Sequence, residues 1–148
     1  MADSAPTLRA WCESRPAVSS TPSVADPAVE ELERRADGIA LKAFERLAEA
    51  FPTIGEYGQR KLDRTLEDLV AIVQYTAAAR HVDDPSVLDE FLVWLLGLLQ
   101  SRGISAEVLT GGVTTLMPLM GQIDPLSSQM AEIAVGRLVG QDPQQAAD

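Results

Sequence analysis

The chain has one cysteine and one histidine, and these two shortages exclude several kinds of site. A single cysteine, Cys12, cannot form a disulfide within the chain or build a multi-cysteine zinc or iron–sulfur site. The single histidine, His81, excludes a histidine-rich metal site and leaves one candidate for imidazole chemistry. The sequence therefore predicts no metal site.

Basic residues are also scarce, because 12 Lys and Arg face 22 Asp and Glu and give a net charge of -10. An acidic chain repels phosphate backbones, so no nucleic-acid partner is expected. The longest apolar run, residues 91–99, is far shorter than the roughly 20 residues of a membrane helix. No apolar export signal follows a basic start either. We therefore expect a cytoplasmic protein without membrane insertion.

What is present is typical of one globular domain: 148 residues, 46% of them hydrophobic and 23% charged. Residues 1–25 contain three prolines and no apolar periodicity, which predicts a flexible tail before a domain at 26–140 and a second flexible tail at 141–148. Leu8 and Trp11 have the spacing of a docking motif for a protein partner. The alternative is a leader without a role.

Asp-Pro pairs begin at Asp26, Asp84 and Asp124, each just before apolar residues at helical spacing. Asp can cap the free amides of a first turn, and Pro suits the first helical position. The spacing predicts five helices: 27–51, 59–80, 85–102, one starting after Ser105 that Pro118 bends or ends, and 125–139. No segment alternates with a period of two, so the predicted fold class is all-α.

Residues 91–99 are apolar around the whole helix, which indicates either a central core element or a subunit interface. We expect a homodimer through this helix, with Phe91 or Trp94 as the anchor and with Val93 and Leu96 facing outward. Elsewhere, the Gly111-Gly112 pair has no phosphate-loop context and predicts close helix contact or local bending.

Residues 75–113 resemble the middle of phycobiliproteins, where a Tyr-rich helix leads to an Ala-Gly-Asp corner, a Ser-Val-Leu-Glu-Asp-like helix start and a Leu-Gly-Val-Pro turn. Here residues 86–90 read Ser-Val-Leu-Asp-Glu, and residues 101–105 read Ser-Arg-Gly-Ile-Ser. Residues 81–85, His-Val-Asp-Asp-Pro, are similar to the corner before the G helix of globins. The resemblance implies a globin-like helical bundle.

Two departures from these families bear on cofactors. Thr65 stands where phycobiliproteins attach bilin to a cysteine, although Asp68 is kept, which argues against a covalent bilin. His81 lies in the corner itself and not on the preceding helix, where globins place their proximal histidine, which argues against haem. The chain is then similar to the non-haem sensor domains of stressosome regulators. That resemblance implies a dimer that senses a ligand and relays the signal to protein partners.

The ligand-pocket candidates are Asp68, Arg64, Lys61, Tyr75 and His81. By the resemblance, Asp68 with Arg64 and Lys61 occupies the face that holds pyrrole nitrogens and propionates. The competing interpretation of these three is an exposed ion-pair ladder. Tyr75 lines a cavity or belongs to the core. His81 is an axial ligand, a general base, or a cap at a helix end.

We expect a non-enzymatic signalling or ligand-sensing module that works through homodimerisation, protein partners and an apolar small-molecule ligand. Catalysis is not expected, because no nucleophile motif accompanies the one histidine. Two alternatives stay open: a ligand-free adaptor, and a protein that binds a tetrapyrrole or cobalamin without a covalent bond.

Overall fold

The computed structural model describes residues 26–141, which form six α-helices and one short 3-10 helix and contain no strand. This confirms the all-α class. The elements are α2 (Pro27–Arg34), α3 (Ala36–Ala50), the 3-10 helix η1 (Pro52–Glu56), α4 (Gln59–Val82), α5 (Ser86–Ser101), α6 (Ala106–Gly121) and α7 (Pro125–Gln141). The predictions for residues 1–25, including Leu8 and Trp11, and for residues 142–148 lie outside the described part of the chain.

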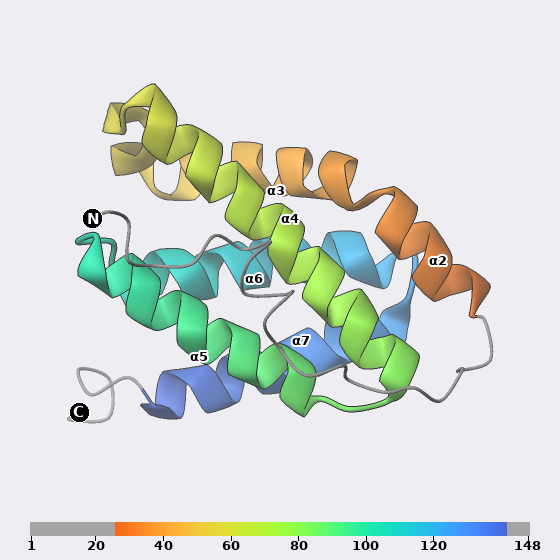
Figure 1. The fold of residues 1–148 in the computed structure, drawn as a ribbon. Helices are drawn as coiled ribbons and strands as arrows, with labels where there is room; N and C mark the ends of the chain where they lie inside the picture. Colours follow the sequence, from red (N-terminus) through yellow and green to blue (C-terminus); the bar gives the residue numbers. More distant parts are fainter. Residues whose placement is uncertain (1–25, 142–148) are drawn as a thin grey trace.

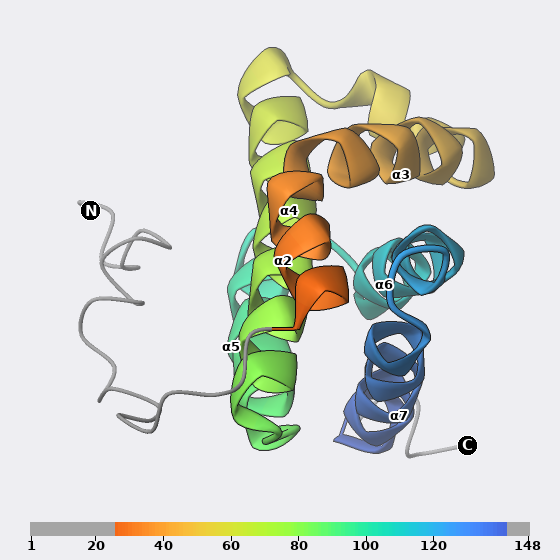
Figure 2. The same cartoon turned by 90° about the vertical axis from the view of Figure 1, so that its right-hand side faces the viewer.

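Helix α4 is the longest helix of this part of the chain and packs against α2, α3, α5, α6 and α7. Figure 1 shows α4 crossing the molecule diagonally with α5 beside it. The turned view in Figure 2 places α4 and α5 on one side of the bundle and α6 and α7 on the other. The central position of α4 means that groups on it can contact most of the other helices.

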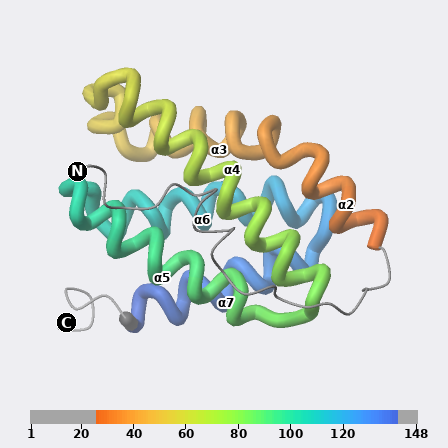
Figure 3. The backbone as a smooth tube through the Cα atoms, viewed as in Figure 1, coloured from red at the N-terminus to blue at the C-terminus, as the bar shows by residue number. Residues whose placement is uncertain are grey.

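The chain reverses direction after α4 and returns along α5, as the trace in Figure 3 shows. Asp83 closes α4 in the left-handed conformation, with φ 54°, which a short polar side chain tolerates better than most. The amide of Asp84 donates to the Ala79 carbonyl at 2.9 Å and satisfies one of the free carbonyls of the last turn. The corner between α4 and α5 is therefore built by Asp83 and Asp84.

The Asp-Pro pairs that begin at Asp26, Asp84 and Asp124 mark helix starts as predicted. Asp26 Oδ1 accepts a hydrogen bond from the Ala28 amide at 2.9 Å, and Asp84 Oδ1 accepts one from the Ser86 amide at 3.0 Å. Asp124 stands just before α7 and accepts a hydrogen bond from the Ser127 hydroxyl. Each carboxylate satisfies a polar group of a first turn.

The first predicted helix, 27–51, is wrong as a single element. It breaks at Arg35, which has φ -99° and ψ 7° and separates α2 from α3. Both pieces pack against α4, but only α3 also packs along α6, so the chain changes direction between them. The apolar spacing continues from Leu32 through Ala36, both buried, and periodicity therefore gives no sign of the break.

Pro118 was predicted either to bend its helix or to end it. It does not end the helix, because α6 continues to Gly121. Proline lacks the amide that would donate to the carbonyl of Thr114. Thr114 is exposed, so water can reach the carbonyl that loses this partner. The helix can therefore continue past Pro118, which lies on its exposed side.

The predictions that Phe91 anchors a dimer interface and that Leu96 faces outward are wrong, because both side chains are buried within the chain. Phe91 belongs with Leu92, Leu95 and Leu99 to the core, and α5 packs against α4, α6 and α7. The neighbouring helices thus cover most of the apolar run without a second copy. Val93 and Gly97 are the exposed positions of the run, and Val93 is the large apolar side chain among them, with 41% of its surface accessible.

The glycine pair in α6 lies where the helices approach closely, as predicted. A Cβ on Gly111 would stand 2.7 Å from the Phe51 ring, and one on Gly112 would stand 3.2 Å from the Leu69 side chain. Contacts this short require the neighbour to move. The pair therefore lets α6 pack tightly against the end of α3 and against α4.

Candidate functional site

Asp68 lines a small cavity between α3, α4, α5 and α6. Its side chain is half-buried on α4, and the surrounding walls are almost entirely apolar. The other lining residues are Leu47, Thr65, Leu69, Ile72, Leu99, Ile104, Val108, Leu109 and Gly112. Within residues 26–141, the Asp68 carboxylate makes no hydrogen bond or ion pair. It is thus an ionisable group in apolar surroundings without a direct partner in this part of the chain.

Burial raises the pKa of the Asp68 carboxyl from its ordinary 3.8 to about 7. The charge of Arg102 acts against this shift, that of Glu67 adds to it, and that of Arg64 again opposes it. Desolvation dominates because the carboxylate receives no hydrogen bond that would favour its charged form. Asp68 is therefore divided between its charged and neutral forms near neutral pH.

The cavity is small, with a volume of about 20 Å³. That is room for one water-sized group. An ammonium or N–H group at the tip of a ligand fits beside Asp68, but the body of the ligand does not. A tetrapyrrole would require the surrounding helices to move apart.

The structure does not bring the five predicted pocket residues together. Lys61 is exposed, and its ammonium lies 5.1 Å from the centre of the Tyr57 ring. His81 lies in the last turn of α4, where its Nε2 is 3.2 Å from Glu33 Oε1. Thirteen residues of helix separate it from Asp68, or roughly 20 Å. Of the five, only Asp68 lines the cavity.

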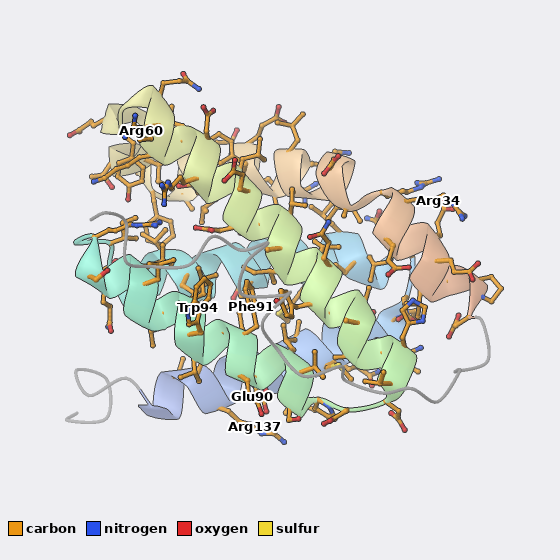
Figure 4. All side chains as sticks on the ribbon, viewed as in Figure 1. Arg34, Arg60, Glu90, Phe91, Trp94 and Arg137 are labelled. Atoms are coloured by element: carbon orange, nitrogen blue, oxygen red, sulfur yellow. The ribbon has the colours of Figure 1, made fainter. Side chains whose placement is uncertain are left out.

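Tyr75 is buried and belongs to an aromatic row between α4 and α5. Its ring stacks on that of Phe91, with 4.0 Å between the centroids and 4° between the planes. The Phe91 and Trp94 centroids are 5.8 Å apart. Figure 4 shows Phe91 and Trp94 next to each other on α5. Arg64 is half-buried one turn before Asp68 on α4.

A second polar cluster ties the end of α4 to the starts of α2 and α7. Arg80 Nε donates to Asp124 Oδ2 at 2.8 Å, and one of its terminal nitrogens lies 3.1 Å from Asp26 Oδ2. Asp124 is only 4% exposed. Burial alone would raise its pKa, but hydrogen bonds from Arg80 and Ser127 and the charge of Arg80 hold the pKa below its ordinary value.

Sequence reasoning missed Arg80 and Arg102. The Asp-Pro pattern marks Asp26 and Asp124 as caps, but nothing in the sequence shows that one arginine reaches both. Arg102 follows the last residue of α5 and acts on Asp68, which is 34 positions earlier in the chain. Only the packing of α5 against α4 brings these two charges near each other.

No group of three or more His, Cys, Asp or Glu side chains within residues 26–141 is placed to hold a metal ion. No helix in the same range combines the length and the apolar character needed to cross a bilayer.

Comparison of the sequence with known protein families and with curated proteins finds no match. The likeness to phycobiliproteins and globins therefore stays a prediction based on residues 75–113.

Proposed function

We propose that the chain is a non-enzymatic signalling module that senses a small ligand at Asp68 and passes the signal to a protein partner. One observation carries the proposal: the Asp68 carboxylate lines an apolar cavity, has no direct partner between residues 26 and 141, and has a pKa of about 7. Such a carboxylate accepts a cationic or N–H group near neutral pH and gains a charge partner by doing so.

The position of the cavity supports a route for the signal. Its walls come from four helices, with Leu47 on α3, Leu99 on α5 and Leu109 on α6 around Asp68 on α4. A change of charge or volume at one shared wall alters the packing of all four helices, because protein interiors are close-packed. The partner would then bind a surface whose shape depends on the state of Asp68.

The test compares three full-length proteins: the native chain, Asp68→Asn and Asp63→Asn. Asp63 is an exposed aspartate on the same helix and serves as the matched control. Each protein is purified at neutral pH and denatured, and its organic extract is analysed by mass spectrometry. We expect an amine or other N–H donor with the native chain and with Asp63→Asn, and much less of it with Asp68→Asn. Identical extracts from all three would contradict the proposal.

We further propose that two copies associate, with Val93 as the contact residue on α5, because it is the large apolar side chain that α5 leaves exposed. Val93→Glu should then give a monomer by light scattering with helical circular dichroism retained. Leu41→Glu, at another exposed leucine, is the control and should leave the dimer intact. A native chain that is monomeric at high micromolar concentration would contradict this association.

A ligand-free adaptor is the second candidate, and a surface on α7 favours it. Leu126 and Ile133 are 52% and 54% exposed, and Met130 lies between them. These three residues have the spacing of one helix face and line a groove of about 210 Å³ beside Arg80 and Pro85. If the adaptor interpretation holds, Ile133→Glu abolishes binding to the partner and Asp68→Asn leaves it unchanged. The sensing proposal expects Asp68→Asn to alter that binding.

A further inference from the structure

We propose that a groove between the start of α3 and the end of α6 is a second ligand site, which binds a small organic anion with an aliphatic part. This groove is called here the α3–α6 groove. The α2–α3 side contributes Arg34, Arg35 and Lys42 to it, and the α6 side contributes Leu119, Gln122 and Ile123. The groove and the Asp68 cavity share no lining residue, so the two sites are separate.

The α3–α6 groove has room for a small molecule. Helices α3 and α6 pack along each other, and in Figure 1 the start of α3 lies above the end of α6. Gly38 lines the groove in the first turn of α3, and a Cβ at this position would meet nothing within 4 Å. The volume of the groove is about 550 Å³, and small-molecule sites commonly measure about 300–1,000 Å³.

The charged residues that line the α3–α6 groove are all basic. Arg34 ends α2, Arg35 stands at the break, and Lys42 follows on α3. No acidic residue lines the groove, although the whole chain has a net charge of -10. Positive charge gathered along a groove raises the local concentration of anions.

Nearby carboxylates balance this charge only in part. Glu31 makes ion pairs with both Arg34 and Arg35, so one carboxylate serves two guanidinium groups. Each guanidinium group has five N–H donors and keeps some of them for a ligand. Lys42 makes no ion pair with any residue from 26 to 141. Three positive charges and one negative charge leave a net charge of +2 at the groove.

The apolar residues of the groove select the rest of the ligand. Ile39 and Leu119 are buried and Ile123 is half-buried, so they give the groove an apolar base. No aromatic side chain lines the groove, and a planar base would find no ring to stack on. A ligand whose anionic head lies beside the arginines and whose aliphatic part lies against Leu119 and Ile123 uses both sides.

The test measures the binding of octanoate to the full-length chain by isothermal titration calorimetry. Two further ligands separate the two parts of octanoate: 1-octanol has the chain without the charge, and inorganic phosphate has charge without the chain. We expect octanoate to bind more tightly than either. Phosphate that binds as tightly as octanoate would overturn the aliphatic part of the proposal, and 1-octanol that does so would overturn the anionic part.

Charge variants locate the binding. Lys42→Gln should weaken octanoate binding about two- to fivefold, as expected for one exposed charge. Arg60→Gln is the matched control, because it removes the same charge from an exposed position far from Arg34 (Figure 4) and should leave the affinity unchanged. Glu31→Gln should strengthen binding, since it releases two guanidinium groups. Equal weakening in Lys42→Gln and Arg60→Gln would reduce the effect to net charge and would overturn the assignment.

A pair of glycine variants tests the groove without any change of charge. Gly38→Leu places a side chain in the α3–α6 groove and should weaken octanoate binding. Gly136→Leu, at an exposed glycine of α7 that also has open space around it, should leave binding unchanged. Circular dichroism checks that both variants stay helical. Octanoate affinity that is the same in both variants, or no binding to the native chain at millimolar octanoate, would contradict the proposal.

Discussion

Asp68 and Asp124 are both withdrawn from water beside α4, and yet their pKa values shift in opposite directions. Asp124 receives hydrogen bonds from Arg80 and Ser127, and these outweigh desolvation and lower its pKa. Asp68 receives no hydrogen bond from the described residues, and desolvation raises its pKa to about 7. The comparison shows that direct partners, more than depth in the fold, determine whether a buried carboxylate keeps its charge.

The two sites also differ in what they can do. The Arg80 cluster satisfies its charges internally and joins three helices, so it is suited to hold the fold together. The Asp68 cavity leaves a charge unsatisfied, which is a cost to stability that a ligand or a proton removes. Proteins commonly accept such a cost where they bind something.

The largest effect is expected from breaking the satisfied site with Asp124→Ala. The Arg80 side chain, which is only 13% exposed, then loses its main partner. The loss of one member of a buried ion pair costs about 3–5 kcal/mol. Urea unfolding measures this loss. Glu31→Gln, which alters an exposed acid beside Arg34 and Arg35, should change the midpoint far less. Equal changes in the two variants would mean that the Arg80 cluster is not a structural centre.

The next effect separates the two aspartates by pH. The folded-state pKa of Asp68 is raised, so its contribution to stability is present below pH 3.8 and is lost as the pH rises to about 7. Asp68→Asn should remove this pH dependence. As the pH rises from 3.8 to about 7, the free energy of unfolding of the variant should increase by about 2–4 kcal/mol relative to that of the native chain. The pKa of Asp124 is lowered, so its contribution is lost as the pH falls below the ordinary aspartate range. Urea unfolding at a series of pH values tests both signs.

An intermediate effect is expected from Asp26→Ala, which removes both an N-cap and the second partner of Arg80. The loss of a cap costs about 1 kcal/mol. Asp26→Asn keeps an oxygen for the cap but removes the charge, so the difference between the two variants isolates the cap. Thermal unfolding monitored by circular dichroism provides the measurement. If Asp26→Asn destabilises the protein as much as Asp26→Ala does, the ion pair between Asp26 and Arg80 contributes more to stability than the cap does.

The smallest effect sharpens the Asp68 side of the comparison. The Arg102 charge opposes the upward shift, so Arg102→Gln should raise the pKa of Asp68 further. Carboxyl carbon NMR during a pH titration measures this directly. Arg60→Gln, at an exposed arginine in the first turn of α4, should leave the Asp68 titration unchanged. A lower pKa in Arg102→Gln would contradict the assignment of Arg102 as the opposing charge.

The sequence predicted those parts of the fold that depend on neighbouring residues. Asp-Pro pairs gave the helix starts, because a cap and its amides lie within three residues of each other. Apolar spacing gave the helices of residues 26–141, apart from the break at Arg35, and the absence of strands in this range. Asp68 was predicted as a pocket residue through the likeness to phycobiliproteins, whereas Lys61 and His81 were grouped with it although they lie apart from its cavity.

The sequence by itself determined the helical class, the approximate helix boundaries and the acidic charge, since each depends on composition or on local spacing. The tertiary structure alone decided the break at Arg35, the burial of Phe91 and Leu96, and the different states of Asp68 and Asp124. These features depend on which helices pack together. Arg80 and Arg102 act on residues more than thirty positions away in the sequence, and no local sequence pattern can show contacts between residues so far apart.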